Sequence, residues 1–125
     1  MPTRSKDKRS FKKSFIDCLH GLEFTLTNED NFKREIILGI IALIMCFILK
    51  VSKLEFIIVL IALVLISEVI NTAIERAVDL YTTKYNETAK IAKDVSAFSV
   101  LLTSIFALVI GLLIFGEKII TLIGG

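Results

Sequence analysis

The stretch from Val95 to Phe115 contains no charged residue. A helix needs about 20 consecutive apolar residues to cross the hydrocarbon layer of a bilayer. This one segment therefore predicts a membrane protein rather than a soluble domain. The composition agrees, because hydrophobic residues make up 54% of the chain and the mean hydropathy is +0.75. The usual apolar share of soluble domains is about 45–50%.

Two more apolar segments predict two further spans, over about 32–49 and about 54–73. Upstream of them, apolar residues recur at steps of three and four over about 11–27. That period is typical of an amphipathic helix, and beside membrane spans we expect it to lie on the membrane surface. The predicted fold class is therefore an all-α membrane protein with a surface helix and three transmembrane helices.

The chain has room for one domain, which we expect to cover residues 11–125 with its third span over about 95–115. Residues 1–10 are expected to be a disordered basic leader. The net charge of +2 is too balanced to predict nucleic-acid binding.

Lysine and arginine predict the orientation of the spans. They crowd the region up to Arg34 and recur between the second and third spans, whereas only Lys50, Lys53 and Lys118 fall on the other side. The positive-inside rule then places the N-terminus and the second loop in the cytoplasm. We expect a multi-pass protein of the cytoplasmic membrane.

The second span ends in an acidic stripe. Glu68, Asn71, Glu75 and Asp79 follow one another at steps of three, four and four residues. On a helix of 3.6 residues per turn, these steps align on one face. Ionisable groups near membrane depth are costly and usually pair, conduct or catalyse. The stripe is therefore the first candidate for a functional site.

The stripe and its surroundings suit phosphoryl transfer to a lipid hydroxyl. The carboxylate nearer the lipid can accept a proton, and the one nearer water can hold a metal ion. Glu29, which precedes the first span, should reach the same face as Glu75, and two carboxylates suffice for Mg²⁺. Lys93 offers a cation for phosphate, and Asp94 a carboxylate to orient it. The sequence has no phosphate-binding loop of the G-x-x-x-x-G-K-[ST] type.

Two other classes of function fit a buried carboxylate. A small proton- or cation-coupled transporter would use Glu68 as its intramembrane carboxylate, although the first and third spans offer no acidic partner at the midplane. A non-enzymatic scaffold would use the stripe to hold subunits together. Charges at helix ends can also be plain boundary markers.

The motif resembles a known family, the small bacterial diacylglycerol kinases and undecaprenol kinases. The family pattern E-x-x-N-[ST]-A-x-E-x-x-V-D is matched by Glu68, Asn71, Thr72, Ala73, Glu75, Val78 and Asp79. The resemblance also covers NEDNF from Asn28, KY at Lys84, and AKIAKD from Ala89. It implies an ATP-dependent lipid kinase of the inner membrane that uses Mg²⁺.

The resemblance also implies roles for individual residues. Glu68 would be the general base, and Glu29 and Glu75 would bind the Mg²⁺ of ATP. The nucleotide and phosphate site would be lined by Asn71, Asp79, Lys93 and Asp94, with Glu35 as a weaker candidate. A homotrimer with sites shared between subunits is likewise implied.

The chain departs from the family at two positions. Asn86 stands where a histidine is common, and Phe98 stands where a small residue is common. These changes concern nucleotide contacts and the packing of the third span. The sequence leaves open whether the acceptor alcohol is diacylglycerol or undecaprenol, because the expected lipid contacts are generic Ile, Leu, Val and Phe side chains.

Overall fold

The computed structural model describes residues 10–124 and is all-helical. Its helices are α1 (Phe11–Asn28), α2 (Asp30–Leu49), α3 (Leu54–Tyr81) and α4 (Glu87–Gly124). The leader expected over residues 1–10 lies outside the described residues except for Ser10. The Ser10 hydroxyl accepts a hydrogen bond from the backbone N–H of Lys13 at 3.2 Å and so caps α1.

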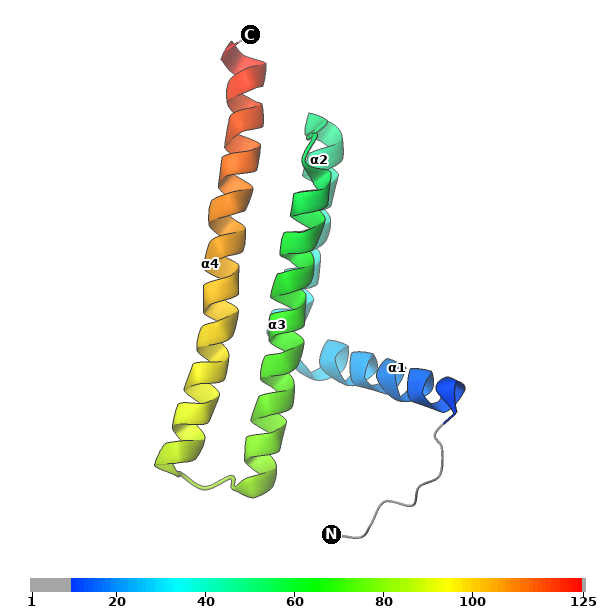
Figure 1. Cartoon of the computed structure of the whole chain (residues 1–125), viewed down its shortest axis with the longest axis vertical. Coiled ribbons are helices and arrows are strands. Elements are labelled where there is room, and N and C mark those ends of the chain that lie inside the picture. The colour runs from blue at the N-terminus through cyan, green and yellow to red at the C-terminus, as the bar shows by residue number, and fades with distance from the viewer. Residues whose placement is uncertain (1–9, 125) are drawn as a thin grey trace.

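α2, α3 and α4 run side by side, with α3 in contact with both of the others, while α1 projects sideways from the bundle (Figure 1). A tight turn reverses the chain between α2 and α3. Lys50 closes α2 in the left-handed conformation, with φ of 53°, and the N–H of Val51 bonds back to the carbonyl of Cys46 at 3.0 Å. Because the turn is short, α2 and α3 pack as antiparallel neighbours.

Small residues set how closely α2 and α3 approach. A Cβ atom added at Gly39 would lie only 2.9 Å from the Cγ2 atom of Ile61. Gly39 is therefore the point of α2 at which the backbone meets a side chain of α3. At the other end of the bundle, Lys53 Nζ pairs with Glu117 Oε2 at 3.2 Å and joins the turn to α4.

Two of the helices, α3 and α4, are long and apolar enough to cross a membrane, with mean hydropathies of 2.6 and 2.7 in their most apolar windows. The helices extend beyond the predicted spans, since α3 continues to Tyr81 and α4 begins at Glu87. With about 1.5 Å per residue, α3 is about 42 Å long, which exceeds the hydrocarbon thickness. α2 does not pass the same test, because Lys33, Arg34 and Glu35 lie in its first turns.

The distribution of burial is the reverse of that in a soluble protein. Most large apolar side chains are exposed, such as Ile41, Phe47 and Leu113. The buried polar residues are Thr25, Glu68, Asn71, Thr72 and Ser96. An apolar exterior is expected where lipid or another apolar partner takes the place of water. The buried polar groups define where chemistry can occur.

Candidate active site

Asn71 links α3 to α4 at the centre of the polar region. Its Oδ1 atom accepts a hydrogen bond from the Ser96 hydroxyl at 2.7 Å, and its Nδ2 atom donates to Glu75 Oε1 at 3.3 Å. Ser96 is buried, and sequence reasoning considered it only as a small residue for close helix packing. Its position three residues after Lys93, on the same helical face, is the signal that could have identified it.

Glu68 is the most deeply buried carboxyl group of the stripe, with only 4% of its surface exposed. The Thr72 hydroxyl donates to the backbone carbonyl of Glu68 at 3.0 Å. The side chain of Glu35, from α2, is in hydrogen-bonding contact with that of Glu68. A hydrogen bond between two carboxyl groups requires a proton on one of them. The weaker candidate Glu35 is thus a direct neighbour of Glu68.

Carboxylates from separate parts of the chain converge near Glu68. Both Glu29, at the junction of α1 and α2, and Glu75, on α3, lie within electrostatic range of it. The other oxygen of Glu35, Oε2, is buried and has no hydrogen-bond partner. The structure therefore brings the acidic residue before α2 to the same end of the bundle as the stripe on α3.

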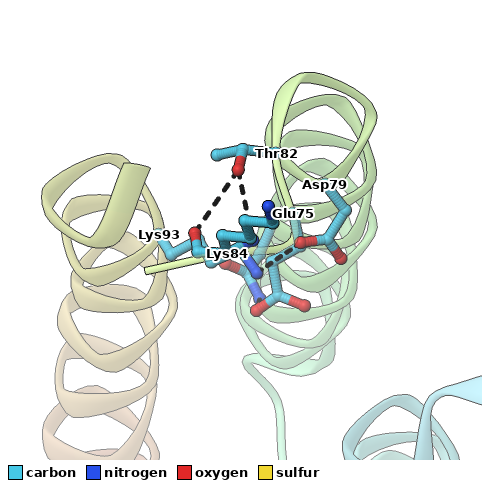
Figure 2. A network of polar contacts seen from close by, with 6 residues as sticks. Glu75, Asp79, Thr82, Lys84 and Lys93 are labelled. Atoms are coloured by element: carbon cyan, nitrogen blue, oxygen red, sulfur yellow. Dashed lines mark hydrogen bonds and ion pairs between the residues drawn. The ribbon is translucent and has the colours of Figure 1, made fainter. Parts of the chain in front are cut away.

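Lys93 is held by α3, although it belongs to α4. Its Nζ atom lies 2.6 Å from Asp79 Oδ1, and Figure 2 shows this pair with Glu75 one turn away on α3. The sequence analysis expected Asp94 to orient Lys93. Instead, Asp94 Oδ2 pairs with Lys90 Nζ at 2.6 Å, one turn along the same helix. Neighbouring residues on a helix point in different directions, so Asp94 follows Lys90 rather than Lys93.

The loop between α3 and α4 explains one departure from the family pattern. Asn86 Oδ1 accepts a hydrogen bond from the backbone N–H of Ala89 at 3.0 Å, so Asn86 acts as the N-cap of α4. Within the loop, the Thr82 hydroxyl accepts from the N–H of Lys84 at 3.1 Å (Figure 2). Phe98 points away from the bundle, with 56% of its surface exposed, so it does not disturb the contact between α3 and α4.

Two cavities meet at the buried carboxyl groups. The acidic cavity has a volume of about 460 Å³ and is lined by Asn31, Arg34, Glu35, Glu68, Asn71, Glu75, Ala97, Val100, Leu101 and Ser104. The apolar groove has a volume of about 420 Å³ and is lined by Glu35, Leu38, Gly39, Ala42, Ile57, Leu60, Ile61, Val64, Ser104, Ala107, Leu108, Gly111 and Phe115. Glu35 and Ser104 line both, so the groove opens onto the acidic cavity.

The remaining predicted site residues lie beside a third cavity. Lys93 and Asp94 line it together with the loop from Thr82 to Asn86, and its volume is about 220 Å³. Asp79 reaches this region through its ion pair with Lys93. The predicted residues thus form two neighbouring groups, with Glu68, Asn71 and Glu75 on the acidic cavity and Lys93 and Asp94 on the loop cavity.

The carboxylates suit a magnesium ion that is shared with a phosphate ligand. Among residues 10–124, no three His, Cys, Asp or Glu side chains form a metal-binding group of their own. Mg²⁺ commonly takes only one or two carboxylates and completes its shell with water and phosphate oxygens. Glu29 and Glu75 meet that requirement, whereas a metal held entirely by protein ligands does not fit the described residues.

A small helical membrane protein with a buried acidic site, a paired lysine and an apolar groove leading to them has the features expected of an enzyme that acts on lipids. Comparison with known proteins defines the family. Residues 17–115 match the profile of the prokaryotic diacylglycerol kinases. This chain therefore belongs to the prokaryotic diacylglycerol kinase family, which consists of lipid kinases. The matched region contains every predicted site residue from Glu29 to Asp94.

Individual relatives carry two different names. The chain is 38% identical over 121 residues to the undecaprenol kinase of Bacillus subtilis (strain 168), and the match covers 92% of this chain and 98% of the relative. It is 33% identical over 101 residues to a diacylglycerol kinase of Synechocystis, covering 78% of this chain and 58% of that protein. The diacylglycerol kinase of Escherichia coli (strain K12) is 31% identical over 91 residues, with 71% and 75% covered.

Proposed function

We propose that this chain transfers the γ-phosphoryl group of ATP to the hydroxyl group of a membrane lipid alcohol. The observation that carries the proposal is the junction between the apolar groove and the acidic cavity at Glu35, beside the buried Glu68. A lipid whose tail occupies the groove would present its polar end to these carboxyl groups. The groove is thus the counterpart of a lipid tail, and the acidic cavity that of a phosphoryl donor.

Glu68 would act as the general base. Its carboxylate accepts the proton of the lipid hydroxyl while the hydroxyl oxygen forms a bond to the γ-phosphorus. The bond from the γ-phosphorus to the bridging oxygen of ADP breaks in the same step, and a lipid phosphate and ADP result. Burial of Glu68 between helices keeps water away from the reacting oxygen and favours the lipid alcohol as the acceptor.

The other site residues would position the phosphates and their charge. Lys93, oriented by Asp79, places a cation beside the phosphates, and Asp94 lines the adjacent loop cavity. Glu29 and Glu75 would hold Mg²⁺, with Asn71 keeping the Glu75 carboxylate in place through its Nδ2 atom. When bound, Mg²⁺ bridges the β- and γ-phosphates and neutralises part of their charge.

We infer that α2, α3 and α4 all span the cytoplasmic membrane of a bacterium, with α1 on its inner surface and the N-terminus in the cytoplasm. The exposed apolar side chains of α2 support its role as the third span, and Lys33 and Arg34 can snorkel at its end. The distribution of Lys and Arg supports the orientation. The resemblance to the family supports a homotrimer, which chemical cross-linking of the purified protein would test.

We propose undecaprenol as the preferred acceptor. The support comes from the undecaprenol kinase of Bacillus subtilis, which aligns with this chain over almost its whole length at higher identity than the diacylglycerol kinases described above. A single long tail also suits a single groove that continues from the acidic cavity. Diacylglycerol, with two acyl chains, is the competing substrate.

The test is a phosphoryl-transfer assay of the purified protein in micelles with labelled ATP, with undecaprenol and diacylglycerol offered separately. We expect labelled lipid phosphate in the presence of Mg²⁺, with the higher kcat/KM for undecaprenol. Glu75→Gln should abolish turnover, whereas Glu55→Gln, the same change at the opposite end of α3, should not. Normal activity of Glu75→Gln would refute the assignment, and ion flux into vesicles without ATP consumption would favour a transporter.

A further inference from the structure

A ring contact joins the surface helix to the catalytic helix. The Cζ atom of Arg76, on α3, lies 4.7 Å from the centre of the Phe24 ring, on α1. This distance is within the range in which a guanidinium group is attracted to the face of an aromatic ring. Phe24 and Arg76 thus connect two helices that otherwise diverge, since α1 leaves the bundle sideways (Figure 1).

The contact is flanked by the two carboxylates proposed to hold Mg²⁺. Arg76 directly follows Glu75 on α3, and Phe24 lies one turn and a half before Glu29. Glu29 is both the C-cap of α1 and the N-cap of α2, with φ of −111° and ψ of 100°. Glu29 therefore sits at the hinge between these helices, and the direction of α1 affects where its carboxylate lies.

The local packing of α1 is consistent with an ordered attachment at this point. Thr25, next to Phe24, is buried, and its carbonyl accepts a hydrogen bond from the N–H of Glu29 at 3.0 Å. Arg76 occupies a position that the pattern E-x-x-N-[ST]-A-x-E-x-x-V-D leaves free, directly after its second glutamate. The side chain is thus outside the motif but adjacent to one of its acidic residues.

We propose that Arg76 is a positioning residue that, by stacking on Phe24, fixes α1 and so sets Glu29 at the distance from Glu75 that Mg²⁺ requires. The inference rests on the proposed role of Glu29 and Glu75 in binding Mg²⁺. Loss of the stack lets α1 move about its hinge, so that a smaller fraction of molecules has both carboxylates in place. The apparent affinity for Mg²⁺ falls by that fraction.

The first experiment compares variants of Phe24 in the full-length protein in micelles. Phe24→Leu should raise the Mg²⁺ concentration for half-maximal turnover about two- to fivefold, the size expected for a partly exposed cation–π contact, while kcat at saturating Mg²⁺ is retained. Phe24→Tyr, which keeps the aromatic ring, should restore the wild-type Mg²⁺ requirement. Phe15→Leu is the matched control on the same helix, because its side chain is 57% exposed.

A double-mutant cycle separates the stack from independent effects of either residue. Arg76→Gln should raise the Mg²⁺ requirement as Phe24→Leu does, and the combined variant should show no further increase. An additive effect of the two changes would overturn the proposal. An unaltered Mg²⁺ requirement in Phe24→Leu, or an effect of Arg76→Gln that appears only with anionic lipids, would overturn it too.

Hydrogen exchange of α1 provides a readout that does not depend on turnover. In Phe24→Leu, the backbone amides around Thr25 and Glu29 should exchange faster than in the wild type, whereas Phe15→Leu should leave them unchanged. Faster exchange with no kinase activity in the wild type would contradict the proposed function but keep the anchoring of α1. Unchanged exchange together with active enzyme would contradict the anchoring alone.

Discussion

Replacement of Lys93 by methionine distinguishes a structural ion pair from a catalytic cation. The Nζ atom of Lys93 lies 2.6 Å from Asp79, and both side chains are 39% exposed. An ion pair with that access to solvent contributes at most about 1 kcal/mol to stability. Lys93→Met should therefore lower the free energy of unfolding by no more than about 1 kcal/mol, since methionine keeps the apolar stem and the helix propensity.

The effect on catalysis should be much larger. A positioned charge that stabilises the phosphates in the transition state is worth about 2.7–4 kcal/mol, so kcat should fall by about 10²–10³-fold. Initial rates of phosphoryl transfer at saturating Mg²⁺ and ATP measure the first quantity, and thermal unfolding in the same micelles measures the second.

Lys90→Met is the matched control. Lys90 lies one turn before Asp94 on α4 and forms an ion pair of the same length, 2.6 Å, but its side chain and that of Asp94 are 59% and 63% exposed. It should lose little stability and little activity. If Lys93→Met were as active as Lys90→Met, or if its low activity were accompanied by an equally large loss of stability, the catalytic role of Lys93 would be refuted.

Three further predictions concern single contacts. Ser96→Ala removes the donor to the buried Oδ1 atom of Asn71 and should cost about 1–3 kcal/mol in unfolding experiments, with Ser99→Ala, whose hydroxyl bonds only to a backbone carbonyl, as the milder comparison. Asn86→Ala removes the N-cap of α4 and should cost about 0.5–2 kcal/mol, seen as faster hydrogen exchange at the Ala89 amide. Gly39→Ala brings a Cβ atom to 2.9 Å from Ile61 and should destabilise the protein by about 1–3 kcal/mol through overpacking. Gly111→Ala, where an added Cβ meets nothing within 4 Å, should not, and equal Tm values for the two glycine variants would contradict the close approach of α2 and α3.

The acidic stripe shows how much of the site could be predicted from sequence. Because its residues follow the period of a single helix, their alignment on α3 required no knowledge of the fold. The hydrogen bond between Asn71 and Glu75 agrees with that alignment. The partner of Lys93 was not predictable in the same way, since Asp79 lies on another helix and competes with Asp94, which is closer in sequence.

The convergence on Glu68 depended on several helices at once. Glu35 reaches Glu68 only because the turn at Lys50 folds α2 back along α3. Glu29 lies near it only because the chain bends between α1 and α2. Sequence reasoning anticipated that Glu29 and Glu75 would share one end of the bundle, but it gave Glu35 a minor place.

Sequence alone determined the class of this protein and the location of its helices, because apolar runs and a 3.6-residue period are properties of contiguous residues. The tertiary structure decided which polar groups became partners: Asp79 for Lys93, Ser96 for Asn71, and Glu35 for Glu68. These choices depend on the register and spacing of packed helices, which the side chains along the whole contact set together. A change of one residue in that register would leave the motif intact and separate the groups that it brings together.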